Sequence, residues 1–204
     1  MASENKELEN YLSDLPGVGP RQAKRIIYSL LKKDSYFSNR LGDLIKNVRS
    51  NMRLCQETYH YFYSEDPNQR LSPIANDPNR DHSSIMVVEN DSDMDNIEKS
   101  GLWRGTYFVL GGSIKPDTDP TMFNKRIRLQ EFNNRLADNR PINEIILATS
   151  ATVAGDFTSE VLENAIIESR SDITISHLAR GISTGVSLEY VDPNTIASAL
   201  NNRN

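Results

Sequence analysis

Apolar residues in the first quarter of the chain recur at the spacing of amphipathic helices. A first helix is predicted from Leu8, Tyr11, Leu12 and Leu15, and it ends at Pro16, because proline does not continue a helix. A second helix is predicted from Pro20, which suits the first helical position, and its apolar face consists of Ala23, Ile26, Ile27, Leu30 and Leu31. A further amphipathic stretch, expected to close a small helical unit, contains Leu41, Leu44, Ile45, Val48 and Met52.

The remainder of the chain alternates between two kinds of pattern. Short apolar runs predict buried strands at residues 84–88, 106–110, 144–149 and 173–178. Helical spacing lies between and after them, at residues 93–100, 121–137, 158–169 and 193–201. This alternation predicts an α/β fold with a parallel sheet and a C-terminal helix. A polar, aromatic-rich stretch with three prolines precedes the first strand and is predicted to be a loop-rich connector.

The turn between the first two predicted helices reads Leu-Pro-Gly-Val-Gly-Pro. Gly17 and Gly19 allow backbone conformations that other residues avoid, and the helix that follows offers unpaired N–H groups at its positive end, an arrangement that suits phosphate. Helical geometry places basic and aromatic side chains together opposite the apolar face: Arg21, Lys24, Arg25, Tyr28 and Lys32. The alternative is a tight turn between helices with a solvated basic face.

Charge is distributed unevenly along the chain. The 204 residues carry a net charge of −5, but residues 1–53 have a net charge of +4 and the rest −9. Contacts with a polyanion are therefore expected in the first quarter. No apolar run is long enough to cross a bilayer and the first ten residues are charged, so a cytoplasmic protein without a membrane partner is expected.

Four segments resemble the RecR family, in that family's order and over nearly the whole chain. LPGVGPRQAKRIIYSLL is similar to its helix-hairpin-helix, and IMVVENDSDMDNIEKSGLWRGTYFVLGGSIKP to the start of its Toprim domain. EIILATSATVAGDFTSEVL is similar to the next Toprim block, and LARGISTGVSLEYVDPNTIASAL to the C-terminal block. The last segment keeps the family's Gly181, Gly185, Leu188, Glu189 and Asp192.

The resemblance implies a non-enzymatic DNA-binding recombination mediator. Such a protein acts with RecO and RecF to help load the recombinase on single-stranded DNA covered by single-strand-binding protein, and assembles as a homodimer or ring-like homotetramer. It implies a helix-hairpin-helix module at 1–53, a connector at 54–83, a Toprim-like domain at 84–178 and a C-terminal block at 179–204. Non-sequence-specific binding of single- and double-stranded DNA is expected at Gly17, Gly19, Arg21, Lys24, Arg25 and Lys32.

The connector departs from the family. RecR proteins usually carry four zinc-binding cysteines there, but those positions hold Cys55, Thr58, Leu71 and Ile74. One zinc-type ligand remains, and the spacing of His60 and His82 to it matches no common zinc pattern. We therefore expect no zinc. An apolar cluster is expected instead, formed by Tyr59, Tyr61, Phe62, Leu71 and Ile74.

The Toprim-like segment also departs from the enzymes of its class, which bind magnesium through a Glu and a later pair of Asp residues. Glu89 stands at the first position, but the second site lacks a D-x-D motif and has Ala154 where many relatives keep an acid. Glu89, Asp93 and Asp156 remain as partner-binding acids or as ligands of a loosely bound magnesium. The other interpretation is helix capping by Asp91 and Ser92, with Asp93 and Asp95 favouring the first turn.

Two other functions stay open at this point. One is a Toprim-type metal-dependent enzyme, such as a nuclease or a primase relative. The other is a DNA-binding adaptor without a role in recombination.

Overall fold

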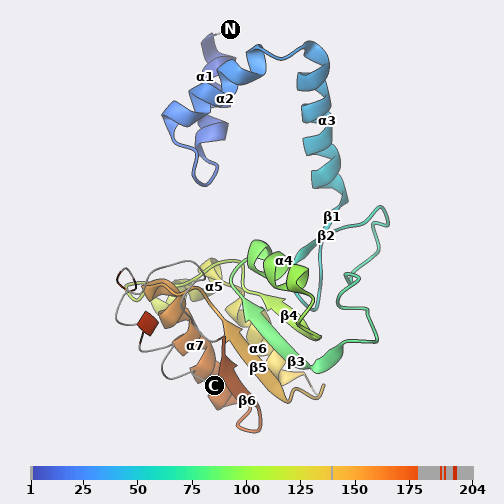
Figure 1. Cartoon of the computed structure of the whole chain (residues 1–204), viewed down its shortest axis with the longest axis vertical. Coiled ribbons are helices and arrows are strands. Elements are labelled where there is room, and N and C mark those ends of the chain that lie inside the picture. The colour runs from blue at the N-terminus through green and yellow to red at the C-terminus, as the bar shows by residue number, and fades with distance from the viewer. Residues whose placement is uncertain (1, 139, 179–188, 190, 192–194, 197–204) are drawn as a thin grey trace. The chain divides into compact units, whose positions relative to one another are not determined.

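The chain folds as two units, residues Met1–Met52 and Arg53–Asn204 (Figure 1). The computed structural model describes residues 2–138, 140–178, 189, 191, 195 and 196. The helix expected at 193–201 lies outside the described residues, apart from Thr195 and Ile196, which are helical. No helix in these ranges is both long enough and apolar enough to span a membrane. The finer division into four parts stays a prediction.

The first unit contains three helices, α1 (Ala2–Ser13), α2 (Pro20–Leu31) and α3 (Ser35–Asn51). Helix α1 ends before Pro16, and the chain leaves it through a turn in which Leu15 N–H donates to the Leu12 carbonyl at 3.2 Å. Pro20 is the first residue of α2, as predicted, and α2 packs against α1. The Asp34 carboxylate caps α3 by accepting from Phe37 N–H at 2.8 Å.

Helix α3 forms as predicted and is the last helix of the first unit, Met1–Met52, but its apolar stripe is not covered by the described residues. It has no buried residue, and its large hydrophobic side chains are exposed, from 36% for Leu41 to 75% for Tyr36. The described part of the first unit buries Glu9, Ala23 and Ile27. The spacing of apolar residues therefore predicted the helix correctly, but it did not show which part of the protein packs against the apolar face of that helix.

The connector contains two short strands that the sequence pattern did not indicate, β1 (Met52–Leu54) and β2 (Tyr61–Tyr63), paired in a two-stranded sheet. A small core of Cys55, Phe62 and Ala75 packs with the partly buried Leu71. The predicted apolar cluster is thus correct for Phe62 and Leu71.

It is wrong for the other three members. Tyr59 packs on the main core, its ring 5.0 Å from that of Phe108, and Ile74 packs on a different cluster. Tyr61 is 46% exposed. Connector side chains therefore divide among three hydrophobic clusters.

The second unit is built on a parallel sheet in the order β4-β3-β5-β6 (Figure 1). Its strands are β3 (Asp81–Val88), β4 (Gly105–Val109), β5 (Glu144–Ala148) and β6 (Thr174–His177). All four were predicted, as was their parallel arrangement. Val88 pairs with Val109 on one side and Ala148 on the other, so β3, β4 and β5 end at one level. The loops that follow these strands are therefore neighbours.

Helices cover both faces of the sheet. They are α4 (Asp91–Ser100), the 3-10 helix η1 (Pro120–Met122), α5 (Phe123–Arg126), α6 (Leu129–Ala137) and α7 (Val153–Ser169). The single helix expected at 121–137 is interrupted at Ile127 and Arg128, and α7 begins at Val153 rather than at residue 158. Asn90, not Asp91 or Ser92, caps α4.

Alternating side chains of the strands supply two cores. Ile85 and Val87 face the larger one, which includes Phe132 of α6 and Leu162 of α7. Met86, Val88 and Tyr107 face the other, with Met94 of α4. This alternation buries both faces at the centre of the sheet and explains the continuous apolar runs Ile85–Val88 of β3 and Ile145–Leu147 of β5.

Candidate functional site

The turn that precedes α2 has two glycines with different roles. Gly17 adopts the left-handed conformation with φ +77°, as the sequence predicted. Gly19, the N-cap residue of α2, has φ −81° and ψ 171°, a conformation open to any residue, so the expectation of an unusual backbone there was wrong. A Cβ built at Gly19 meets nothing within 4 Å. No side chain of the described chain caps this helix end, so the N–H groups of its first turn have no side-chain acceptor there.

The basic side chains of α2 lie on one face, as predicted. Arg21, Lys24, Arg25 and Lys32 are all exposed, whereas Ala23 and Ile27 on the opposite face are 0% and 7% exposed. Arg21 and Arg25 take part in none of the ion pairs among the described residues. The structure therefore brings the predicted DNA-binding residues together at the start and along one face of α2.

Glu9 of α1 modifies this face and was not singled out in the sequence. It is only 8% exposed, and its Oε1 lies 3.8 Å from Lys24 Nζ and 3.3 Å from Lys6 Nζ. The Lys24 charge is thereby partly balanced, which leaves Arg21 and Arg25 as the stronger phosphate donors. No local pattern reveals this pair, because Glu9 and Lys24 meet only when α1 packs on α2.

A second site lies at the carboxyl end of the parallel sheet. Glu89 follows β3, is 7% exposed, and its Oε1 accepts from Ser150 N–H at 2.9 Å and Ser150 Oγ at 2.8 Å. Thr152 Oγ1 then caps α7 by accepting from Gly155 N–H at 3.1 Å. Glu89 thus binds the loop that links β5 to α7, instead of facing solvent.

The other two Toprim acids have separate surroundings. Asp93 belongs to the capping box of α4, where its Oδ2 accepts from Asn90 N–H at 3.0 Å. Asp156 is exposed in the first turn of α7. Among the described residues, no three His, Cys, Asp or Glu side chains are grouped so that they could hold a metal ion. The loosely bound magnesium at Glu89, Asp93 and Asp156 therefore has no common site.

The zinc-type positions of the connector are occupied by hydrogen-bonded and apolar groups. Cys55 is fully buried, and its Sγ accepts from Ser72 N–H at 3.4 Å. Burial raises the pKa of the Cys55 thiol, but hydrogen bonds from Ser72 and Thr58 outweigh it and leave the pKa below its ordinary value. Thr58 Oγ1 lies 2.7 Å from His60 Nδ1, and burial lowers the pKa of that histidine.

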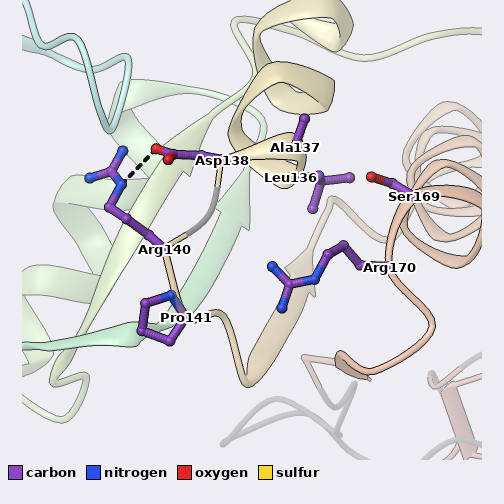
Figure 2. A pocket seen from close by; sticks show the side chains of 7 residues that line it. All are labelled: Leu136, Ala137, Asp138, Arg140, Pro141, Ser169 and Arg170. Carbon is purple, nitrogen blue, oxygen red and sulfur yellow. Dashed lines mark hydrogen bonds and ion pairs between the residues drawn. The ribbon is translucent and has the colours of Figure 1, made fainter.

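A cavity of about 560 Å³ lies where α6 and α7 end (Figure 2). Figure 2 shows Arg140 bonded to Asp138 on one side and Arg170 on the other. Arg140 also contacts Glu57 at 2.6 Å, and Arg170 contacts Asp172 at 2.7 Å. The charges of both arginines are balanced by acids, so this cavity does not stand out as an anion site.

Comparison with known proteins places these features in a family. Residues 6–49 match the model of the RecR helix-hairpin-helix, 83–179 that of the Toprim domain, and 181–204 that of the RecR C-terminal region. Recombination protein RecR of Alcanivorax borkumensis is 34% identical over 199 residues, covering 97% of this chain and 94% of the relative. That of Tropheryma whipplei is 36% identical over 200 residues, covering 97% and 95%. The chain belongs to the RecR family.

The RecR-family matches coincide with the two sites. The helix-hairpin-helix match includes the glycine turn and all of α2, and the Toprim match includes β3 to β6 with Glu89 and Asp156. The resemblance noted in the sequence is therefore confirmed, as is the order of a helical module before a Toprim-type α/β domain.

Proposed function

We propose that this chain is a non-catalytic, DNA-binding mediator of recombinational DNA repair in the cytoplasm. The observation that carries the proposal is the start of α2, where an uncapped helix end at Gly19 adjoins the exposed Arg21 and Arg25. The RecR-family relatives, which are named recombination proteins, support the same role.

The chemistry of this surface suits the DNA backbone. Helix N–H groups and guanidinium groups both bind phosphate oxygens, and neither reads bases from this position. Binding is therefore expected to be independent of sequence, to include single- and double-stranded DNA, and to weaken with salt. Gly17, Gly19, Arg21, Lys24, Arg25 and Lys32 form the proposed contact surface, with Lys24 weakened by Glu9.

Partner proteins complete the proposed role. We infer contacts with RecO and RecF that help the recombinase displace single-strand-binding protein. Of the three Toprim acids, Asp156 is the exposed one and suits a partner contact, whereas Glu89 and Asp93 stabilise the loops beside it. We also infer a homodimer or ring-like homotetramer in which the apolar stripe of α3 lies against a second copy of the chain.

The DNA-binding proposal is tested by the double variant Arg21→Glu, Arg25→Glu in the full chain. Lys24 stays unchanged, because Glu at position 24 would face the buried Glu9 and destabilise the helix pair. Binding to both kinds of DNA should weaken, and the slope of affinity against salt should flatten by about 0.7 to 0.9 for each lost phosphate contact.

A matched control carries the same charge change on α3. Arg40→Glu, Lys46→Glu alters two exposed residues of the same unit and should leave the affinity and slope near those of the unaltered protein. Circular dichroism verifies that all three proteins are folded. Equal affinities and slopes for the α2 variant and the control would place the DNA site elsewhere.

An activity measurement distinguishes the proposed mediator from the alternative, a Toprim-type enzyme. We expect no magnesium-dependent cleavage, ligation or primer synthesis, because the acids lack a common metal-binding group in the described chain. Magnesium-dependent turnover that disappears in a Glu89→Ala variant would establish the enzyme instead.

A further inference from the structure

A basic surface that no local sequence pattern indicates lies beside the carboxyl end of β4. It consists of Lys115, Lys125 and Arg126, which we call the basic loop surface. All three are exposed, and none forms an ion pair with any described residue. Residues 111–128 carry a net charge of +2 within a second unit whose residues 54–204 total −9. Positive charge is thus concentrated in one place on an acidic body.

The segments that carry these side chains are anchored to the sheet. Gly111 and Gly112, with φ +84° and +157°, let the loop after β4 pass closely under the segment 126–128. A Cβ at Gly112 would lie 2.9 Å from the Arg126 carbonyl oxygen. Arg128 Nη1 donates to the Val109 carbonyl at 2.8 Å. These contacts hold residue 126 beside the end of β4.

The far side of the loop is anchored as well. Ile114 is fully buried, and its N–H donates to Thr158 Oγ1 of α7 at 2.8 Å. Lys115 therefore follows a residue that is fixed in the core. The backbone of the basic loop surface is therefore anchored on both sides, which places the three side chains on neighbouring segments without a ligand.

Two adjoining hollows carry the basic side chains. One, of about 370 Å³, is lined by Ser113, Lys115, Asp117, Thr118, Asp119, Met122 and Arg126. The other, of about 200 Å³, includes Lys125 and shares Arg126. Asp119 is already engaged, since its Oδ1 accepts from Thr121 N–H at 2.9 Å and Thr121 Oγ1 at 2.8 Å. Asp117 also lines the first hollow, but within the described chain neither aspartate forms an ion pair with Lys115 or Arg126, whereas both arginines of the cavity in Figure 2 are paired with acids.

We propose that the basic loop surface is a second DNA contact, which binds the sugar-phosphate backbone on the Toprim-type unit. The inference rests on the proposed function and adds a site to it. The cations lie along two hollows that share Arg126. Such a row fits the consecutive phosphates of a nucleic-acid backbone better than it fits a single phosphate group. The site also lies at the carboxyl edge of an open parallel sheet, where ligands of such folds bind.

The test compares two full-length double variants. Lys125→Glu, Arg126→Glu changes the basic loop surface, while Lys99→Glu, Arg104→Glu makes the same charge change before β4, at the amino end of that strand instead of its carboxyl end. Affinity for a dT oligonucleotide is measured against salt concentration. The first variant should bind more weakly than the control, with a slope flattened by about 1.4, or 0.7 per lost phosphate contact. Lys115→Glu, a single change on the other segment, should flatten it by about half as much.

The α2 variant, Arg21→Glu, Arg25→Glu, separates this inference from the proposed function. Loss of binding in the α2 variant with none in the basic loop variant overturns the second contact and leaves the helix-hairpin-helix site standing. Loss in the basic loop variant alone supports the second contact and refutes the first. The third measurement is the binding of dTMP, which carries a single phosphate. If the basic loop variant loses dTMP binding but keeps oligonucleotide binding, the surface is a single-phosphate site and the proposal is overturned.

Discussion

Gly17 and Gly19 stand two positions apart, yet the structure requires glycine only at Gly17. At Gly17 the positive φ of +77° is strained for any residue with a Cβ. At Gly19 the backbone is ordinary and the surrounding space is open, so the missing side chain benefits only an external partner. The two positions can therefore be separated by substitution.

We predict that Gly17→Ala and Gly19→Ser change the free energy of unfolding in opposite directions. Gly17→Ala should lower the free energy of unfolding by about 1–2 kcal/mol, because a Cβ is disfavoured in the left-handed region. Gly19→Ser should raise it by a few tenths of a kcal/mol, because serine caps a helix slightly better than glycine. Its hydroxyl would occupy the N–H groups proposed to bind phosphate, so DNA affinity should fall. Thermal unfolding and DNA titration measure the two effects; a Gly19→Ser protein with unchanged affinity would contradict the proposed phosphate contact.

Single residues of the site differ in how far the sequence predicts them. The basic face of α2 follows from helix periodicity, because it depends only on neighbours along one helix. The Lys24–Glu9 pair and the gathering of Lys115 with Arg126 depend on packing between segments, and no local spacing encodes them. Glu89 was singled out by the resemblance to Toprim enzymes, which have a Glu at that strand end, but its hydrogen bonds to Ser150 depend on the neighbouring strand and were not predicted.

Three segments of the second unit are joined by one polar network. Arg80, just before β3, donates both guanidinium ends to the Glu98 carboxylate of α4, and Tyr107 Oη of β4 donates to Glu98 Oε2 at 2.7 Å. Arg80 Nη1 also donates to the Gly105 carbonyl at 3.1 Å. The network therefore fixes α4 against the strands that it covers.

Titration of Glu98 couples this network to pH. Burial raises the pKa of Glu98, but hydrogen bonds from Arg80 and Tyr107 outweigh it and leave the pKa below its ordinary value. A carboxyl group whose pKa is lower in the folded state stabilises the fold above its unfolded pKa of about 4.3. That contribution is lost as the pH falls through the folded pKa.

We predict that Glu98→Gln lowers the free energy of unfolding at neutral pH by about 1.5–3 kcal/mol, the range for a hydrogen bond to a charged group. The difference between the two proteins should shrink on acidification below about pH 4.3, because the unaltered protein then loses its charged partner. Urea unfolding at a series of pH values measures the difference. A constant gap down to pH 2 would show that Glu98 acts through packing rather than charge.

At the scale of elements, strands were easier to predict than helix boundaries. Strands β3 and β4 contain apolar runs that are buried on both faces, Ile85–Val88 and Tyr107–Val109, and such runs are visible in the sequence, whereas β6 (Thr174–His177) has a single apolar residue and none that is fully buried. The interruption at Ile127 and Arg128 arises because Arg128 N–H donates to the Leu110 carbonyl at 2.8 Å and leaves the helical pattern. The spacing of apolar residues cannot predict a hydrogen bond of this kind, because it joins two segments that meet only in the folded protein.

For the whole molecule, the exposed stripe of α3 is the feature that bears on assembly. We predict that Leu44→Lys, Ile45→Lys shifts the protein toward a monomer, because two charges would enter the interface proposed between copies. The control Asn39→Lys, Asn47→Lys adds the same charge at exposed polar positions of α3 and should leave the assembly intact. Sedimentation equilibrium measures the mass of each; the same mass for both variants would remove α3 from the interface.

The small core of the first unit has a consequence for its folding. With Ala23 and Ile27 as the buried apolar residues of its described part, this unit hides too little apolar surface to be stable by itself. If a second copy of the chain covers the exposed apolar surface of this unit, folding is coupled to association, and the stability of the unit falls when the protein is diluted. The helical unit should then melt at a temperature that rises with protein concentration, whereas the sheet-based unit, with two cores of its own, should melt at a fixed temperature.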